Sequence, residues 1–180
     1  MQYMDLKTFN FLHSFAGRGT FIDFFVVFFA KYLSYFLVLA ALFFLFYVIK
    51  SSFRLRFYVL FFTILTLILS RGVLVSVIRF FYHKPRPFTA LEFAPLVSSG
   101  SFSFPSGHAA FFFALALVIF SFNKRWGWWF LGLSFLNGVA RVVAGLHWPS
   151  DILGGIGVAI ISFFIIKKLM NSIHRQFELS

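Results

Sequence analysis

One histidine–aspartate pair in the sequence has the spacing that nucleophilic chemistry needs. Asp151 follows His147 by four residues. A carboxylate so placed can accept the imidazole N–H, fix the tautomer and leave the other ring nitrogen as a nucleophile. Acidic residues are also common in the first turn of a helix, which is the alternative interpretation of Asp151. The residues around the pair therefore decide between the two.

A second histidine, His108, closes the tetrapeptide Pro105-Ser106-Gly107-His108, directly before an apolar run that starts at Ala109. Ser106 is a natural N-cap, so the pattern predicts a helix that begins after it. The free backbone N–H groups of Gly107 and His108 and the positive end of the helix dipole would then face one point. A helix start of this kind is a ready anion site.

Three arginines accompany these motifs, namely Arg79, Arg86 and Arg141. An arginine at the membrane centre costs roughly 2.5–3.5 kcal/mol even on the lenient insertion scale, so these side chains need an anionic partner. A phosphate suits planar, bidentate donors well. Lys84 and His83, close to Arg86, are possible further contacts. Snorkelling to lipid headgroups is the alternative for Arg79, and Arg71 has only interfacial or packing interpretations.

The elements that position these residues must be membrane helices. Of the 180 residues, 61% are hydrophobic and 12% charged, and the mean hydropathy is +0.91. A soluble domain carries about 25% charged residues, so a water-facing globule is excluded. Five apolar runs approach the ~20 residues that a spanning helix needs: Leu33–Ile49, Leu55–Phe81, Ala109–Phe122, Trp126–Val143 and Ile152–Ile166.

A further apolar stretch, Phe21–Ala30, is too short to cross alone and is expected to lie at the interface or to insert halfway. It follows a weakly amphipathic segment, Leu6–Phe15. We therefore predict an all-α, polytopic membrane bundle of five to six helices. No repeat or linker divides the chain, so residues 1–180 are expected to form a single domain.

The basic residues predict the orientation of this bundle. The formal net charge is +11, from 16 Lys+Arg and 5 Asp+Glu. Eight of the cations lie in two short connections and the C-terminal tail: Lys50, Arg54, Arg56, Lys124, Arg125, Lys167, Lys168 and Arg175. Cytoplasmic loops retain such residues, so the histidine and arginine motifs are expected on the outer face. The charge is thus no nucleic-acid footprint, and the absence of cysteine excludes disulfides and thiolate sites.

The motifs resemble the signature of the type 2 phosphatidic acid phosphatase superfamily. Its patterns Lys-x6-Arg-Pro, Pro-Ser-Gly-His and Ser-Arg-x5-His-x3-Asp are similar, in order and spacing, to Arg79-x6-Arg86-Pro87, Pro105-Ser106-Gly107-His108 and Arg141-x5-His147-x3-Asp151. Two positions depart from the patterns. Arg79 replaces the usual lysine, and Ala140 stands where the third motif usually has serine.

The resemblance implies a role for each matched residue. His147 would attack phosphorus and become a phosphohistidine, Asp151 would orient it, and His108 would protonate the leaving oxygen and then deprotonate water. The equatorial oxygens would be held by Arg79, Arg86, Arg141, Ser106 and Gly107. No cofactor or metal is needed, because three arginines and a helix N-terminus supply the charge, and the same arginines would repel a zinc ion. Since His147 must be neutral while His108 is charged, a bell-shaped pH dependence is expected.

The expected substrate is a lipid phosphate or diphosphate, because a site at the outer interface without a soluble domain meets headgroups. The small bacterial members of the bacitracin-resistance type, which this chain resembles, hydrolyse undecaprenyl diphosphate at the outer face of the cell membrane. Phosphatidylglycerophosphate, phosphatidic acid and lipid A 1-phosphate are alternatives. A non-catalytic protein that only binds anionic lipid is an alternative of another class. The expected partners are the lipid phosphate and membrane lipids, with no nucleic acid.

Overall fold

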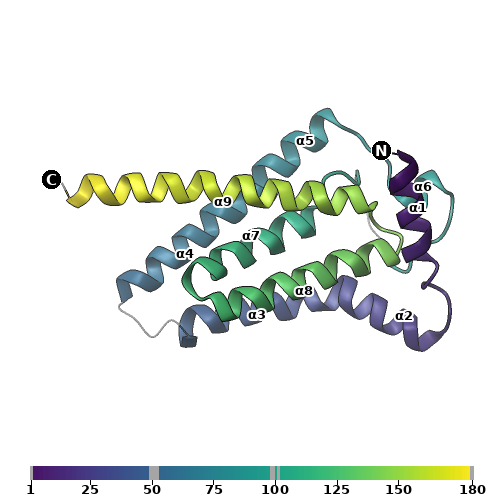
Figure 1. Ribbon diagram of the computed structural model, residues 1–180, viewed down its shortest axis with the longest axis horizontal. Helices are drawn as coiled ribbons and strands as arrows, with labels where there is room; N and C mark the ends of the chain where they lie inside the picture. The colour runs from purple at the N-terminus through teal and green to yellow at the C-terminus, as the bar shows by residue number, and fades with distance from the viewer. Residues whose placement is uncertain (1, 49–52, 98–99, 101, 179–180) are drawn as a thin grey trace.

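The computed structural model describes residues 2–48, 53–97, 100 and 102–178, and all regular structure in these ranges is helical (Figure 1). The elements in chain order are α1 (Gln2–His13), α2 (Thr20–Val27), η1 (Phe28–Tyr32), α3 (Leu33–Phe43), η2 (Phe44–Val48), α4 (Phe53–Leu67), η3 (Ile68–Leu74), α5 (Val75–Phe81), α6 (Pro87–Ala90), α7 (Gly107–Phe122), α8 (Lys124–Val143) and α9 (Pro149–Glu178), where η marks a π-helical segment. The predicted all-α bundle is confirmed.

Within the described ranges, three helical segments are long and apolar enough to cross a membrane: Thr20–Phe46, Phe53–Phe81 and Pro149–Ser172. The first of them corrects the prediction for Phe21–Ala30, which is not a separate half-inserted helix. It continues through η1 into α3, because the backbone hydrogen bonds run on past Lys31. Ten residues are too short to span a bilayer as a helix, but the joined segment is long enough.

Helix α7 lies at the centre of the bundle, packed between α8 and α9 and against α4. Figure 1 shows α7 and α8 as an antiparallel pair beside the long α9. Most residues of α7 are buried, including Phe112, Leu115 and Val118. A helix that is apolar on every side belongs in a core, so its neighbours fix it on all sides. Its N-terminus, with the Pro-Ser-Gly-His motif, is held equally firmly.

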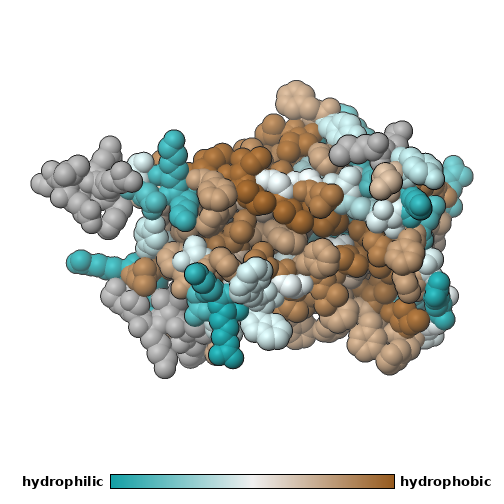
Figure 2. Space-filling model, viewed as in Figure 1, coloured by the Kyte–Doolittle hydropathy of each residue, from teal (hydrophilic) through white to brown (hydrophobic). Residues whose placement is uncertain are grey.

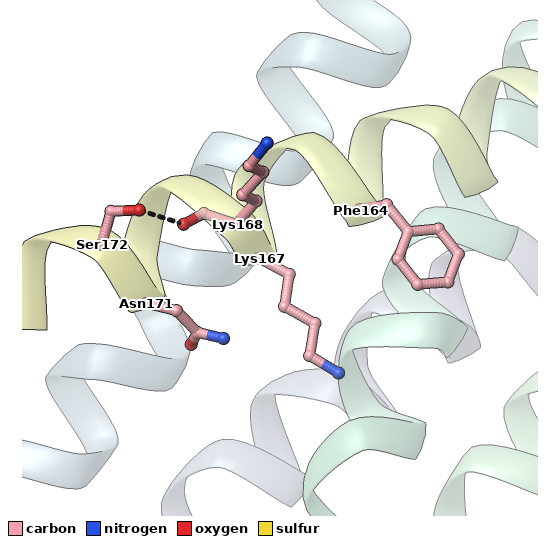
Figure 3. A pocket seen from close by; sticks show the side chains of 5 residues that line it. All are labelled: Phe164, Lys167, Lys168, Asn171 and Ser172. Carbon is pink, nitrogen blue, oxygen red and sulfur yellow. Dashed lines mark hydrogen bonds between the residues drawn. The ribbon is translucent and has the colours of Figure 1, made fainter. Parts of the chain in front are cut away.

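The predicted basic connections gather at one end of the bundle. The start of α4, the α7–α8 connection and the second half of α9 lie together at the left of Figure 1, opposite α1 and α6. Figure 2 shows an apolar middle with hydrophilic residues toward both ends. Lys167 and Lys168 project from α9 at the left-hand end, beside Asn171 and Ser172 (Figure 3). Lys50 lies outside the described residues.

Helix α9 packs tightly against the Pro-Ser-Gly-His motif at Gly155. A Cβ at this position would lie 2.6 Å from the carbonyl oxygen of Ser106 and 2.7 Å from the Cβ of Ala109. Because these atoms belong to a packed helix start, they cannot move aside cheaply. Gly155→Ala is therefore expected to destabilise the protein by about 1–3 kcal/mol, as overpacking does. Thermal unfolding in detergent measures this as a lower Tm.

A matched control for this substitution lies two residues further along the same helix. A Cβ at Gly157 would meet no atom within 4 Å. Gly157→Ala is expected to leave the Tm unchanged, or to raise it slightly, because alanine favours helix over glycine. Equal Tm values for the two variants would contradict the close contact between α9 and the motif.

Candidate active site

The buried pair His147 and Asp151 lies where α8 gives way to α9. His147 is in the short connection after α8, and Asp151 is in the first turn of α9, as predicted. The two side chains are 1% and 0% exposed, and Nδ1 of His147 lies 3.4 Å from Oδ2 of Asp151. The same Oδ2 accepts the backbone N–H of Trp148 at 2.8 Å. The carboxylate is thus fixed beside one imidazole nitrogen, and Nε2 remains for other contacts.

The surroundings of His147 favour its neutral form. Burial lowers the pKa of His147 to about 4, and the charges of Arg141 and Arg86 act in the same direction, while Asp151 opposes them. At neutral pH the imidazole therefore carries no charge. A neutral imidazole with a free lone pair is the form that can act as a nucleophile.

Arg86 borders the second nitrogen of this imidazole. Its Nη1 lies 3.4 Å from Nε2 of His147 and donates to the carbonyl of Leu146 at 2.8 Å. Its Nη2 donates to the carbonyl of Gly100 at 3.0 Å. Arg86 is 5% exposed, and burial lowers its pKa from the usual arginine value. A guanidinium held in this way places positive charge where Nε2 would meet a phosphate.

The Pro-Ser-Gly-His motif forms the start of α7, as the sequence predicted. Ser106 is the N-cap, and its Oγ accepts the backbone N–H of Ala109 at 3.4 Å. Its own backbone N–H donates to the carbonyl of Asp151 at 2.9 Å, which ties the motif to α9. Arg79, in the last turn of α5, donates from Nη2 to the carbonyl of Pro105 at 2.9 Å. Arg79 is therefore held beside the N-terminus of α7.

Arg141 supplies a third guanidinium from the last turn of α8. It is 5% exposed, and its Nη1 donates to the carbonyl of Ala30 in η1 at 2.9 Å. Its buried Nε has no hydrogen-bond partner among the residues that the structure describes. Arg141 is also close enough for its charge to act on His108. Arg141 therefore keeps a hydrogen-bond donor for a ligand close to His108 and His147.

Lys84 does not extend toward the three arginines. Its ammonium lies 3.1 Å from Oδ2 of Asp5 and 3.0 Å from Oδ1 of Asp151, and it donates to the hydroxyl of Ser150 at 2.7 Å. Lys84 is thus paired with two carboxylates, as electrostatic attraction favours. Lys84 supports Asp151 from the side opposite His147.

Asp5 is the site residue that sequence reasoning missed. It belongs to α1, and its Oδ1 and Oδ2 accept the backbone N–H and hydroxyl of Ser150 at 2.9 and 2.6 Å. This carboxylate therefore caps the start of α9 from a helix almost 150 residues away in the sequence. The amphipathic character predicted for this segment gave no signal for the contact.

His83 lies at the edge of the site rather than within it. Its side chain is exposed, and its ring centroid is 4.3 Å from that of Phe102. A cavity of about 930 Å³ lies beside it, with Lys84 and Asp5 on its wall. Most of its other lining residues are apolar: Leu6, Tyr82, Ala90, Leu91, Phe104, Trp148 and Leu153. His83 is thus placed to contact a headgroup or chain rather than the reacting atoms.

Three histidine, aspartate or glutamate side chains are not brought together as a metal-binding group anywhere in the described ranges. The two histidines of the site instead lie close to arginine guanidinium groups, whose charges act on both of them. The arrangement as a whole offers a neutral imidazole, an oriented carboxylate, a second histidine at a helix start and three arginines. This combination suits a reaction in which a dianionic group is bound and transferred.

Comparison with known proteins finds a matching family and similar relatives. Residues 59–175 match the PAP2 superfamily. Phosphatidylglycerophosphatase B of Bacillus subtilis is 33% identical over 114 residues, which cover 57% of this chain and 54% of that protein. Undecaprenyl-diphosphatase BcrC of the same species is 32% identical over 99 residues, covering 54% and 51%. The chain spans about half the length of these curated relatives.

The fold has a close counterpart among solved structures. The crystal structure of LpxE from Aquifex aeolicus superposes with a TM-score of 0.74 at 29% identity, covering 92% of this chain and 95% of that one. The likeness therefore extends beyond the motifs to the arrangement of the helices. The match over residues 59–175, with the motifs placed at converging helix ends, shows that the chain belongs to the PAP2 superfamily.

Proposed function

We propose that the chain is an integral-membrane lipid phosphatase that hydrolyses undecaprenyl diphosphate to undecaprenyl phosphate. One observation carries the proposal. Buried His147, held 3.4 Å from Asp151, faces the guanidinium of Arg86 with its other nitrogen. A protein that only binds anionic lipid needs cations but gains nothing from an oriented, neutral imidazole.

The reaction begins with attack of His147 Nε2 on the terminal phosphorus. A P–N bond forms as the bridging P–O bond breaks, and the electron pair leaves on the bridging oxygen. Asp151, whose Oδ2 lies 3.4 Å from Nδ1, is placed to accept a hydrogen bond from the imidazolium as it develops, and so stabilises it. His108 protonates the leaving oxygen, then takes a proton from the water that cleaves the P–N bond. Phosphate and the free imidazole are the products of the second step.

The proposed reaction needs no metal ion. Arg86, Arg141 and Arg79 supply positive charge, and the N–H groups at the start of α7 supply directed donors. Phosphoryl transfer demands mainly positioning and charge stabilisation from the protein, which these groups provide. In other phosphotransferases a divalent cation supplies the same charge.

The lipid nature of the substrate is supported by the surroundings of the site. The cavity of about 930 Å³ beside Lys84 is lined mainly by apolar side chains, and apolar spanning helices lead to it. The likeness to undecaprenyl-diphosphatase BcrC supports a lipid diphosphate. We place the site on the outer face of the bacterial inner membrane, since the basic connections lie at the opposite end of the bundle (Figure 1).

A second substrate is supported by a specific observation. The relative that is 33% identical over 114 residues is a phosphatidylglycerophosphatase. Phosphatidylglycerophosphate is a monoester, so its leaving group is an alcohol rather than a phosphate. Phosphatidic acid and lipid A 1-phosphate complete the set of substrates that the site chemistry admits.

Phosphate release from a panel of detergent-solubilised lipids tests the proposal. Undecaprenyl diphosphate is expected to give a higher kcat/KM than phosphatidylglycerophosphate, phosphatidic acid or lipid A, with rates unaffected by EDTA. Preference for a phospholipid would reject the substrate while keeping the enzyme class. Activity lost with EDTA would contradict the metal-free reaction, and no release from any lipid would overturn the phosphatase.

A further inference from the structure

One cation inside the second spanning segment takes no part in the reaction described so far. Arg71 belongs to Phe53–Phe81, and its side chain is exposed. Within the described ranges no hydrogen bond or ion pair is found for it. An arginine at membrane depth is costly unless it meets an anion or reaches the interface. These observations raise the question of which anion Arg71 binds.

The backbone around Arg71 is anchored to the start of α7. Arg71 lies in the π-helical segment η3, and its neighbour Ser70 donates to the carbonyl of Ala110 at 2.9 Å. Val75, the first residue of α5 directly after this segment, is fully buried and packs with Ala110. Single π-helical turns in a helix occur often at functional sites. The segment η3 is therefore fixed relative to the Pro-Ser-Gly-His motif.

The guanidinium of Arg71 lies directly over Gly107. A Cβ at Gly107 would collide with Arg71 Nε, and would lie 2.8 Å from Cζ and 2.9 Å from Cδ. The absence of a side chain at Gly107 thus makes room for this arginine. The charge of Arg71 is also close enough to act on His108 and on Arg79. Arg71 therefore lies on the side of the site where His108 would meet the leaving oxygen.

The two substrate classes differ in what leaves on that side. When phosphatidic acid is cleaved, the leaving group is a diacylglycerol, an alcohol that is neutral once His108 has protonated it. When a lipid diphosphate is cleaved, the bridging oxygen leaves as part of a lipid monophosphate with at least one negative charge. A planar guanidinium with free donors suits such a phosphate. Of these two substrates, only the diphosphate therefore gains from a further cation beside the leaving group.

We propose that Arg71 binds the leaving phosphate of a lipid diphosphate, and so sets the preference of this enzyme for diphosphates over monoesters with an uncharged leaving group, such as phosphatidic acid. The inference rests on the proposed phosphatase function and names the group that selects its substrate. Arg71 then contacts the phosphate next to the lipid, whereas Arg79, Arg86 and Arg141 hold the one that is transferred.

The test compares undecaprenyl diphosphate with phosphatidic acid in the same detergent micelles. Arg71→Gln is expected to lower kcat/KM for the diphosphate by about 100-fold, as the loss of one transition-state donor does. The value for phosphatidic acid is expected to change by less than about 3-fold, because no leaving phosphate is present. Arg71→Lys, which keeps the charge but loses the planar fork, is expected to lie between wild type and Arg71→Gln for the diphosphate.

The control variant is Arg18→Gln. Arg18 is exposed, and its Nε donates to a backbone carbonyl in its own connection, at Ser14. Both substrates are expected to be hydrolysed by this variant at wild-type rates. An equal loss of both activities in Arg71→Gln would overturn the proposal in favour of general phosphate binding or a structural role. No loss for either substrate would overturn it as well.

The behaviour of the wild-type enzyme separates this inference from the proposed function. If the wild-type enzyme cleaves phosphatidic acid but not the diphosphate, the phosphatase survives, while the diphosphate substrate and the role of Arg71 both fail. If the diphosphate is cleaved and Arg71→Gln keeps the wild-type ratio of the two kcat/KM values, only the role of Arg71 fails.

Discussion

The substitution His147→Ala is expected to lower kcat by about 10⁴-fold or more, because it removes the proposed nucleophile and with it the proposed covalent intermediate. The protein should still fold, since a smaller side chain leaves the hydrogen bond from Trp148 to Asp151 intact. Phosphate release from a lipid diphosphate measures the loss, and acid-labile, base-stable labelling of the wild-type protein from a radiolabelled terminal phosphate measures the intermediate. Label on the His147→Ala protein would contradict the assignment.

The other histidine gives a control with a different signature. His108→Ala is expected to be slow with lipid substrates, because the leaving oxygen needs a proton. With p-nitrophenyl phosphate, whose leaving group departs without one, His108→Ala should regain much of its first-step rate, while His147→Ala should not. Rescue of both variants, or of neither, would show that the roles of nucleophile and general acid are wrongly assigned to His147 and His108.

The pH profile of the wild-type enzyme follows from the same assignment. Because burial lowers the pKa of His147 to about 4, the nucleophile stays neutral as the pH falls below the ordinary histidine value. The acid limb of kcat/KM should therefore appear near pH 4 and reflect protonation of His147. An alkaline limb from His108 is expected in kcat, because burial and the charges of Arg141 and Arg71 lower the pKa of His108 in the free protein and a bound, dianionic phosphate raises it again. An acid limb centred near pH 6.5 would indicate a solvent-exposed imidazole instead.

The second large effect is expected from Asp151→Asn. The amide nitrogen of asparagine would donate to Nδ1 of His147, so that the proton moves to Nε2 and blocks the nucleophilic lone pair. A fall in kcat of about 10⁴-fold is expected from this change of tautomer, with a smaller effect on KM. Steady-state phosphate release over a range of lipid concentrations separates the two constants. A variant that keeps a tenth of the wild-type kcat would rule out an orienting role for Asp151.

Asp5→Asn is the matched control for this substitution. It removes one of the two carboxylates that hold Lys84, yet it leaves Asp151 beside His147 and Lys84. A partly buried ion pair of this kind is worth about 1 kcal/mol, so a loss in activity of about tenfold or less is expected. If Asp5→Asn were as damaging as Asp151→Asn, the network as a whole, rather than the tautomer of His147, would govern catalysis.

The local features of the site could be predicted because short-range chemistry fixes them. Ser106 caps α7 and Pro149 begins α9, as the residue types indicated. Arg79 and Arg141 lie in the last turns of their helices, since the apolar runs end just beyond them. Backbone geometry at a helix end depends on a few neighbouring residues, so the sequence carries that information directly.

The long-range contacts could not be predicted in the same way. The pairing of Lys84 with Asp5 and Asp151 joins three elements, and no pattern within any one of them indicates it. The position of Arg71 over Gly107 depends on the π-helical turn of η3, which shifts the register of side chains along the helix. The apolar pattern also predicted that a separate segment ends before Lys31, whereas one continuous helical segment runs through Lys31 from Thr20 to Phe46.

The contact between Asp5 and Ser150 also bears on how the protein is made. The capping carboxylate belongs to the first helix, whereas Ser150 and Asp151 begin the last one. Helix α1 also packs against α8, where Nδ1 of His13 lies 2.8 Å from the carbonyl oxygen of Val143, but its contact with Ser150 can form only after the start of α9 has been synthesised. The proposed orienting carboxylate, Asp151, belongs to the same first turn of α9, so the proposed reaction requires a chain that extends into this last helix.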